Sequence, residues 1–201
     1  MKKIEIYKKI MSFEKNMRGV FLYSDLRTIL NCTHLNTFYR IINELVSSKI
    51  LFKFTRNVYL TENFDKNALS QKLYSKSYIS FESILAENLI IGSVPVYRTR
   101  AVKVGKKRSY NSDLVRIEHY GISNELFFGY QNINGIKKAT KEKAVLDTLY
   151  FYCKGLSFYF DVYSDMNLKY LDMKIIYEYL ENYRNPKFVK FAKGFFKERE
   201  L

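Results

Sequence analysis

Tryptophan, proline and cysteine are scarce in this chain. Its 201 residues include no tryptophan, two prolines and two cysteines. Cys32 and Cys153 lie far apart, which matches neither a disulfide framework nor the spacing of a zinc site. We therefore expect two unpaired thiols in a reducing cytoplasm, and the sequence indicates no metal and no cofactor.

Long apolar runs are also missing. No segment approaches the roughly 18 apolar residues that a membrane-spanning helix requires. The N-terminal residues 1–15 carry charges throughout and lack the apolar core of a signal peptide. We expect a cytoplasmic protein with no membrane partner.

The motifs of common catalytic sites are missing as well: the sequence has no HExxH, GxSxG, P-loop or GxGxxG. His34 is expected in a turn and His119 packed within a strand. A metal-dependent nuclease could use only Asp113 and Glu118, beside the cations of 106–108. The sequence favours a protein that is not an enzyme. A nucleic-acid-processing enzyme with a nuclease-like second domain is the alternative.

Positive charge is in clear excess. The chain has 34 Lys and Arg against 20 Asp and Glu, for a formal net charge of +14. Such a surplus attracts polyanions, of which nucleic acid is the usual one. The excess lies within residues 1–143, because residues 144–201 hold nine basic and eight acidic side chains. The last third is therefore expected to be scaffold or an interaction surface.

Residues 18–61 carry the most informative pattern. Apolar residues at steps of three and four predict a helix over 4–13 and a second that Ser24 caps. A polar turn over 31–34 follows, and Thr33 is expected to cap a third helix. The order of helix, tight turn and longer helix is typical of a helix-turn-helix, whose second helix enters the major groove of DNA.

Two short apolar segments then predict a hairpin. The strands are expected over 50–54 and 58–61, around a basic turn at 55–57. We interpret residues 1–65 as a winged helix-turn-helix DNA-binding domain. A plain three-helix domain with a solvated helix face is the alternative.

The predicted DNA contacts lie on the polar face of the third helix and on the wing. Asparagine can bond adenine, arginine can bond guanine, and threonine can contact a thymine methyl group or a phosphate. Cations on the wing are expected to meet phosphate or the minor groove. These contacts are Asn36, Thr37, Tyr39, Arg40, Asn43, Lys53 and Arg56.

A polar segment over 66–77 is expected to connect this domain to a second one over 78–201. Strand and helix patterns alternate irregularly there, which predicts a mixed α+β domain. The expected elements are a helix over 81–87 capped by Ser80, strands over 94–104, 108–111 and 115–120, a hairpin of 126–131 with 136–138, and helices after Thr140, over 173–183 and over 187–200.

Six cations and no acid lie between residues 98 and 108. We expect a hairpin that turns at 105–107, with cations along one face and at an exposed tip. Its two interpretations are a second nucleic-acid patch and a solubilising sheet edge. The cations are Arg98, Arg100, Lys103, Lys106, Lys107 and Arg108.

The string from Ala139 to Asp147 reads as the capped start of a helix. Thr140 is the expected N-cap, and Glu142 lies near the positive end of the helix dipole. Lys143 and Asp147 are four residues apart, so we expect them to pair on the helix surface.

Three strings together resemble a known family. They are Val-Tyr-Leu at 58–60, Tyr-Ile-Ser-Phe-Glu-Ser-Ile-Leu at 78–85 and Ala-Thr-Lys-Glu-Lys-Ala-Val-Leu-Asp at 139–147. With the N-terminal pattern, they resemble AbiEi-type antitoxins of type IV toxin–antitoxin and abortive-infection systems over most of the chain. The family typically has a proline before the Glu-Lys-Ala string, where this chain has Lys141.

The resemblance implies a two-domain transcriptional repressor. Its winged helix is expected to bind inverted repeats in double-stranded DNA of its own promoter. Its second domain is expected to counter a nucleotidyltransferase-like toxin without forming a stable complex with it.

Overall fold

The computed structural model describes residues 3–199, which form two compact units, Met1–Leu73 and Tyr74–Leu201. Within the described residues there are eight α helices and two β-sheets, so the predicted α+β class is confirmed. The boundary between Leu73 and Tyr74 falls inside the predicted connector. The start of that connector is a helix of the first unit.

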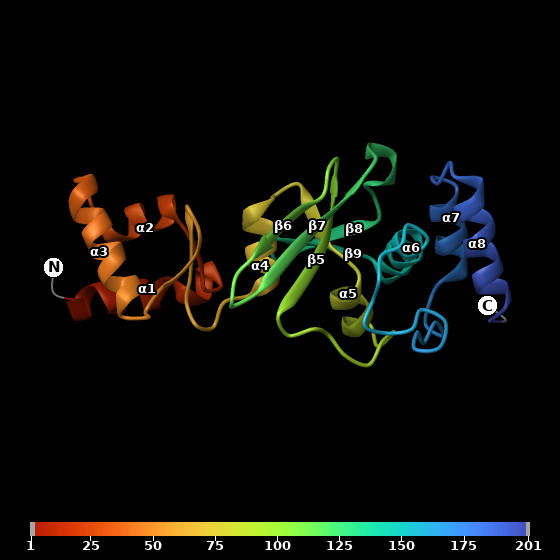
Figure 1. Cartoon of the computed structure of the whole chain (residues 1–201), viewed down its shortest axis with the longest axis horizontal. Coiled ribbons are helices and arrows are strands. Elements are labelled where there is room, and N and C mark those ends of the chain that lie inside the picture. The colour runs from red at the N-terminus through yellow and green to blue at the C-terminus, as the bar shows by residue number, and fades with distance from the viewer. Residues whose placement is uncertain (1–2, 200–201) are drawn as a thin grey trace. The chain divides into compact units, whose positions relative to one another are not determined.

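The first unit packs three helices and a small sheet around one apolar core (Figure 1). Leu26, Phe38 and Leu45 are buried in that core, as the helical spacing predicts, and Phe21 and Leu51 join them from outside the helices. The elements are α1 (Lys3–Met17), β1 (Val20–Leu22), α2 (Tyr23–Leu30), α3 (Leu35–Ser47), β2 (Phe52–Thr55), β3 (Val58–Leu60) and α4 (Lys66–Leu73).

Strand β1 is an addition to the predicted elements. It pairs with β3 in an antiparallel sheet of order β1-β3-β2, so the predicted hairpin gains a third strand. The chain passes directly from β1 into α2, which places the helix N-cap at Leu22. Asp25 accepts a hydrogen bond from the Leu22 N–H at 2.9 Å, and the predicted cap at Ser24 is wrong. At α3 the N-cap is His34 rather than Thr33.

Lys72 is one of the residues that attach helix α4 to the first unit, together with the buried Ala68 and Leu69. The Lys72 ammonium donates to the carbonyl oxygen of Val20 at 2.6 Å and to the Asp25 carboxylate at 3.0 Å. Asp25 therefore both caps α2 and anchors α4.

The second unit is a six-stranded mixed sheet of order β6-β7-β5-β4-β9-β8, with helices packed against it (Figure 1). The Asn134-Gly135 turn joins β8 to β9, which confirms that predicted hairpin. Its elements are β4 (Ser77–Ile79), α5 (Glu82–Glu87), β5 (Arg98–Val104), β6 (Arg108–Asn111), β7 (Arg116–Ile122), a 3₁₀ turn (Asn124–Leu126), β8 (Tyr130–Ile133), β9 (Ile136–Ala139), α6 (Lys141–Tyr152), α7 (Met173–Leu180) and α8 (Pro186–Lys197).

The predicted hairpin between residues 98 and 111 is wrong. Strand β7 lies between β5 and β6, parallel to the first and antiparallel to the second. The link from β5 to β6 therefore crosses over β7 at Gly121. A Cβ atom at that glycine would lie 1.7 Å from the carbonyl oxygen of Gly105, so no side chain fits beneath the crossing.

Helix α6 is buried along nearly its whole length. It contacts α5, α7, α8 and β9, so neighbours surround it. Thr140 caps it by accepting from the Lys143 N–H at 3.2 Å, as predicted. Ser80, expected to cap α5, instead donates its hydroxyl to Asp147 on α6, and the N-cap of α5 is Phe81.

The C-terminal helices follow the predicted break. Asn185 caps α8 and Pro186 occupies its first turn, where a missing N–H costs nothing. The helix ends at Lys197 with Glu198 as its C-cap, so the predicted extension past Lys197 is wrong for 198–199, and Glu200 lies outside the described residues. Both cysteines are unpaired, with Cys32 half-buried and Cys153 exposed. Among the helices of residues 3–199, none combines the length and apolarity that crossing a bilayer demands.

Candidate nucleic-acid interface

The polar face of α3 is solvent-exposed, as the sequence predicts. Asn36, Thr37, Tyr39, Arg40 and Asn43 are all exposed. The opposite face is buried in the core of the first unit through Phe38, Ile41, Ile42 and Leu45. Five side chains with hydrogen-bonding groups thus extend from one rigid helix without contributing to its core.

Arg40 has one neighbour of opposite charge on this face. Its guanidinium lies 2.9 Å from the Glu44 carboxylate, and both side chains are largely exposed. Exposed pairs four residues apart contribute only about 0.3–0.5 kcal/mol. Arg40 can therefore exchange this partner for another acceptor at little cost.

A short turn fixes the position of α3 against α2. Asn31 adopts a left-handed conformation with φ 48°, which asparagine tolerates better than most residues. Beyond the turn, the Tyr23 ring of α2 packs 5.0 Å from the Phe38 ring and 6.1 Å from the Tyr39 ring. Tyr39 therefore joins the exposed face of α3 to the start of α2.

The tip of the β2–β3 hairpin contacts the start of α2 at Tyr23. The carbonyl of Asn57 at its tip accepts a hydrogen bond from the Tyr23 N–H at 2.9 Å. Lys53 and Arg56 are both exposed on the hairpin, as expected. Burial raises the pKa of Tyr59, and the phenols of Tyr39 and Tyr23 add to the shift. Tyr23 thus contacts both Tyr39 on the exposed face of α3 and Asn57 at the tip of the β2–β3 hairpin.

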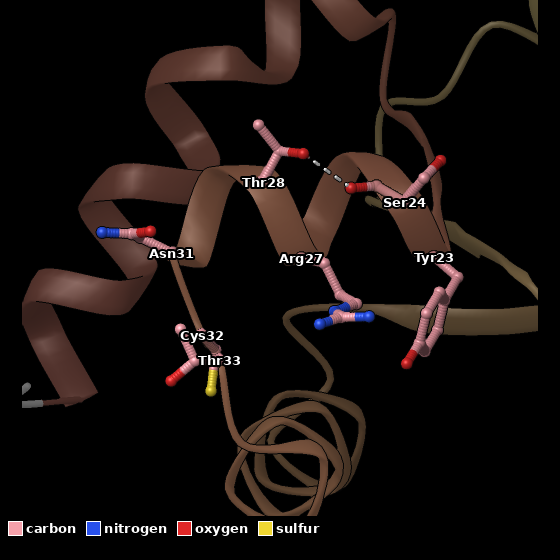
Figure 2. A pocket seen from close by; sticks show the side chains of 7 residues that line it. All are labelled: Tyr23, Ser24, Arg27, Thr28, Asn31, Cys32 and Thr33. Atoms are coloured by element: carbon pink, nitrogen blue, oxygen red, sulfur yellow. Dashed lines mark hydrogen bonds between the residues drawn. The ribbon is translucent and has the colours of Figure 1, made fainter.

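An open pocket of about 450 Å³ lies beside this junction, along α2 and the turn. Figure 2 shows Tyr23 and Arg27 projecting from α2 toward the side on which the chain continues into α3. Neither residue was among the predicted DNA contacts. Their spacing of four residues on one side of α2, where Arg27 is exposed and Tyr23 half-buried, is the signal that could have found them. The lining residues are Tyr23, Ser24, Arg27, Thr28, Asn31, Cys32 and Thr33.

The six cations predicted as a second patch separate into two groups. Arg100 and Lys103 are only 5% and 4% exposed, so assigning them to a surface patch is wrong. Arg100 donates to the Glu82 carboxylate at 2.7 Å, and Lys103 donates to the carbonyls of Val104 and Lys106. The reason is that β5 is an interior strand, flanked by β4 and β7.

The other four remain accessible. Lys106, Lys107 and Arg108 are exposed at and after the crossover, and Arg98 is half-buried at the start of β5. Because β5 and β6 are not paired with each other, these cations do not form one hairpin face.

Glu118 on β7 is the centre of a buried charge cluster. Its carboxylate is 2% exposed and lies 3.0 Å from Arg116, 3.4 Å from Arg100, 3.5 Å from Lys107 and 3.9 Å from Arg98. Burial by itself raises the pKa of Glu118, but Arg100, Arg116 and Lys107 together outweigh it and hold the pKa below its ordinary value. The carboxylate therefore stays ionised at neutral pH.

Strand β7 is buried on both faces, because Glu118 and Tyr120 are as buried as Ile117 and His119. Glu118 was a candidate carboxylate for a nuclease together with Asp113. It is enclosed by four cations, whereas Asp113 is exposed in the β6–β7 turn. Within residues 3–199, no three His, Cys, Asp or Glu side chains gather closely enough to hold a metal ion.

Lys143 and Asp147 form a second buried cluster, and the expected surface pair is wrong. Each side chain is 1% exposed, and the ammonium lies 2.5 Å from the carboxylate. Asp147 also accepts hydrogen bonds from Tyr78 at 3.1 Å and Ser80 at 2.9 Å, while Lys143 donates to Tyr183 at 3.0 Å. Burial, with the Asp147 charge nearby, raises the pKa of Tyr78 and Tyr183 well above its ordinary value.

No protein-family model matches the chain, and no curated protein matches its sequence. Of the predicted DNA contacts, Tyr39 on α3 lies against Tyr23, whose N–H donates to Asn57 at the tip of the hairpin that carries Lys53 and Arg56. Arg116, which the sequence reading passed over, joins Arg98 through Glu118 in the second unit.

Proposed function

We propose that the protein is a sequence-specific DNA-binding repressor, with residues 1–65 acting as a winged helix-turn-helix. One observation carries the proposal: α3 presents Asn36, Arg40 and Asn43 on an exposed face, after a four-residue turn and beside a basic hairpin. Those residue types read base edges in the major groove, which admits one helix. Lys53 and Arg56 on the hairpin suit contacts with the flanking phosphates.

We further propose that the repressor acts as an antitoxin of the AbiEi type. The resemblance of the strings at 78–85 and 139–147 supports this part. In this proposal the protein represses its own operon and counters a nucleotidyltransferase-like toxin without a stable complex. The test is co-expression with a nucleotidyltransferase encoded next to this gene. Restored growth without co-purification supports the antitoxin role, and unrelieved toxicity refutes it.

The repressor proposal is tested by a gel shift with DNA from upstream of the gene, against random DNA of equal length. We expect a clear preference for the upstream DNA. With five to seven phosphates contacted, log affinity should fall against log salt with a slope of about −5 to −6. Equal affinity for both DNAs would refute the repressor proposal.

Two substitutions separate base reading from phosphate contact. Arg40→Ala is expected to weaken specific binding by about 1–3 kcal/mol and to relax specificity, because a base contact is lost. Lys53→Ala is expected to weaken specific and random binding alike and to reduce the salt slope by about one. Lys8→Ala, which removes an exposed charge from α1, is the control and should change neither the specificity nor the salt slope. If Arg40→Ala behaves like Lys53→Ala, Arg40 contacts phosphate.

A further inference from the structure

An open pocket in the second unit lies beside the Glu118 cluster. It has a volume of about 540 Å³ and is formed by the segment entering β5 and the turn between β6 and β7. Arg98 and Arg116 both line it and are register partners on the neighbouring parallel strands β5 and β7. The Arg116 N–H donates to the Tyr97 carbonyl at 2.8 Å, which fixes the two segments to each other.

The cations here outnumber the carboxylates. Arg98, Arg100, Lys107 and Arg116 lie 3.0–3.9 Å from Glu118, and Glu82 is a second carboxylate at 2.7 Å from Arg100. Four cations around two carboxylates repel one another, and that repulsion is an unfavourable term in the unliganded protein. An added anion would relieve it.

The two arginines are placed to receive such an anion. Their side chains are 34% and 49% exposed, in contrast to the buried Arg100. A guanidinium has five N–H donors, more than the single hydrogen bond of Arg116 to Glu118 uses. Paired guanidinium groups suit the oxygens of a phosphate group, which accept bidentate hydrogen bonds.

Two other lining residues narrow the class of ligand. Tyr97 is 72% exposed and lines the pocket next to Arg98, so its ring is accessible to a ligand held by the arginines. Exposed aromatic rings next to cations stack bases while the cations hold the phosphates. Asp113 also lines the pocket, and its negative charge repels an anion. One carboxylate does not cancel the positive charge of the two lining arginines, so the pocket still attracts an anion.

We propose that this pocket binds the phosphate group of a nucleotide through Arg98 and Arg116, with the base on Tyr97. The nucleotide is either free or part of a single strand, and the chemistry recognised is the same in both. This site is separate from the proposed DNA-reading face of α3 and does not depend on it.

The test is calorimetric titration of the full chain with ATP, with inorganic phosphate, and with a single-stranded oligonucleotide. The oligonucleotide is titrated into the Arg40→Ala background, so that binding at α3 does not obscure the result. We expect Arg98→Gln and Arg116→Gln each to weaken binding about tenfold or more, because a charged hydrogen bond is lost. Circular dichroism checks that each variant is folded. We expect both to fold, because Arg100 and Lys107 still neutralise Glu118 in either variant.

Three further variants make the assignment specific. Lys106→Gln removes an exposed charge outside the pocket lining and should leave affinity unchanged. Asp113→Asn should strengthen binding, by up to about fivefold for an exposed charge. Tyr97→Ala should weaken ATP binding and leave phosphate binding unchanged.

The probes also separate the two sources of the nucleotide. Binding of ATP that depends on both arginines supports a free nucleotide, and binding of the oligonucleotide alone with the same dependence supports a strand. Absence of binding by all three probes overturns the proposal. Equal effects of Lys106→Gln and Arg116→Gln overturn it as well, because the attraction is then diffuse.

Discussion

Asp147→Asn is expected to destabilise the second unit by about 3–5 kcal/mol, because it leaves the Lys143 ammonium buried without its counter-charge. Asp147 accepts from Lys143, Tyr78 and Ser80. An amide of the same shape has one acceptor oxygen for three donors, and its own N–H groups face those donors. Denaturant unfolding followed by circular dichroism measures the loss, and hydrogen exchange of the α6 amides assigns it to the second unit.

A surface pair with the same spacing provides the control. Arg40 and Glu44 are also four residues apart, but both are exposed. Glu44→Gln should therefore change stability by no more than about 0.5 kcal/mol. The double variant Lys143→Met/Asp147→Leu should recover most of the stability that Asp147→Asn loses, because no buried charge remains unpaired. Equal losses in Asp147→Asn and Glu44→Gln would contradict the buried-pair account.

Glu118→Gln is the second substitution with a large expected effect. It removes the carboxylate that four cations share, so their mutual repulsion is no longer balanced. We expect a loss of about 3–5 kcal/mol at neutral pH, the range for breaking a buried ionic cluster. Glu87→Gln is the matched control, since Glu87 pairs with Lys138 but is 49% exposed, and it should cost no more than about 1 kcal/mol.

The pH dependence of this effect has a definite sign. The pKa of Glu118 is lower in the folded chain than its ordinary value, so folding favours the ionised form. Its contribution is present above the unfolded pKa of about 4.3 and is lost as the pH falls through the lower folded value. The stability difference between wild type and Glu118→Gln should therefore shrink in acid.

Glu82 acts in the opposite direction. Burial raises its pKa although Arg100 opposes the shift, so ionisation of Glu82 works against folding as pH rises. Because Glu82 is present in both proteins, its contribution largely cancels in the difference. A stability gap that stays constant down to strongly acid pH would contradict the assignment to Glu118.

Local patterns were enough to predict α1, α2, α3 and the Asn134-Gly135 hairpin, whereas α4 was predicted only as part of a polar connector. The periodicity of α3 identified its buried and exposed faces, because both follow from spacing along one helix. Strand β1 was missed because three residues carry too little pattern. The cap at Ser24 was wrong because the chain passes from β1 directly into α2, and the cap at Ser80 was wrong because its hydroxyl donates to the distant Asp147.

The second unit's charged residues could not be assigned from local sequence. Arg100 lies in a cation-rich stretch, yet Glu82 and the Ser157 carbonyl meet it in the interior. Lys143 and Asp147 have the spacing of a surface pair, but α6 is enclosed by other helices and the sheet. In both cases burial depends on segments far along the chain, which no short window contains. The order of β5, β6 and β7 could not be predicted for the same reason, because β7 pairs with β5 across the intervening β6.

That strand order also constrains the sequence of events during folding. Strand β6 has β7 as its neighbour in the sheet and no partner on its other side. The β6–β7 hairpin is local and can form early, whereas parallel pairing of β7 with β5 must wait until the whole hairpin has reversed direction. The link at Gly105 then closes over Gly121. We therefore expect the docking of this hairpin against β5 to be a late step in the assembly of the larger sheet.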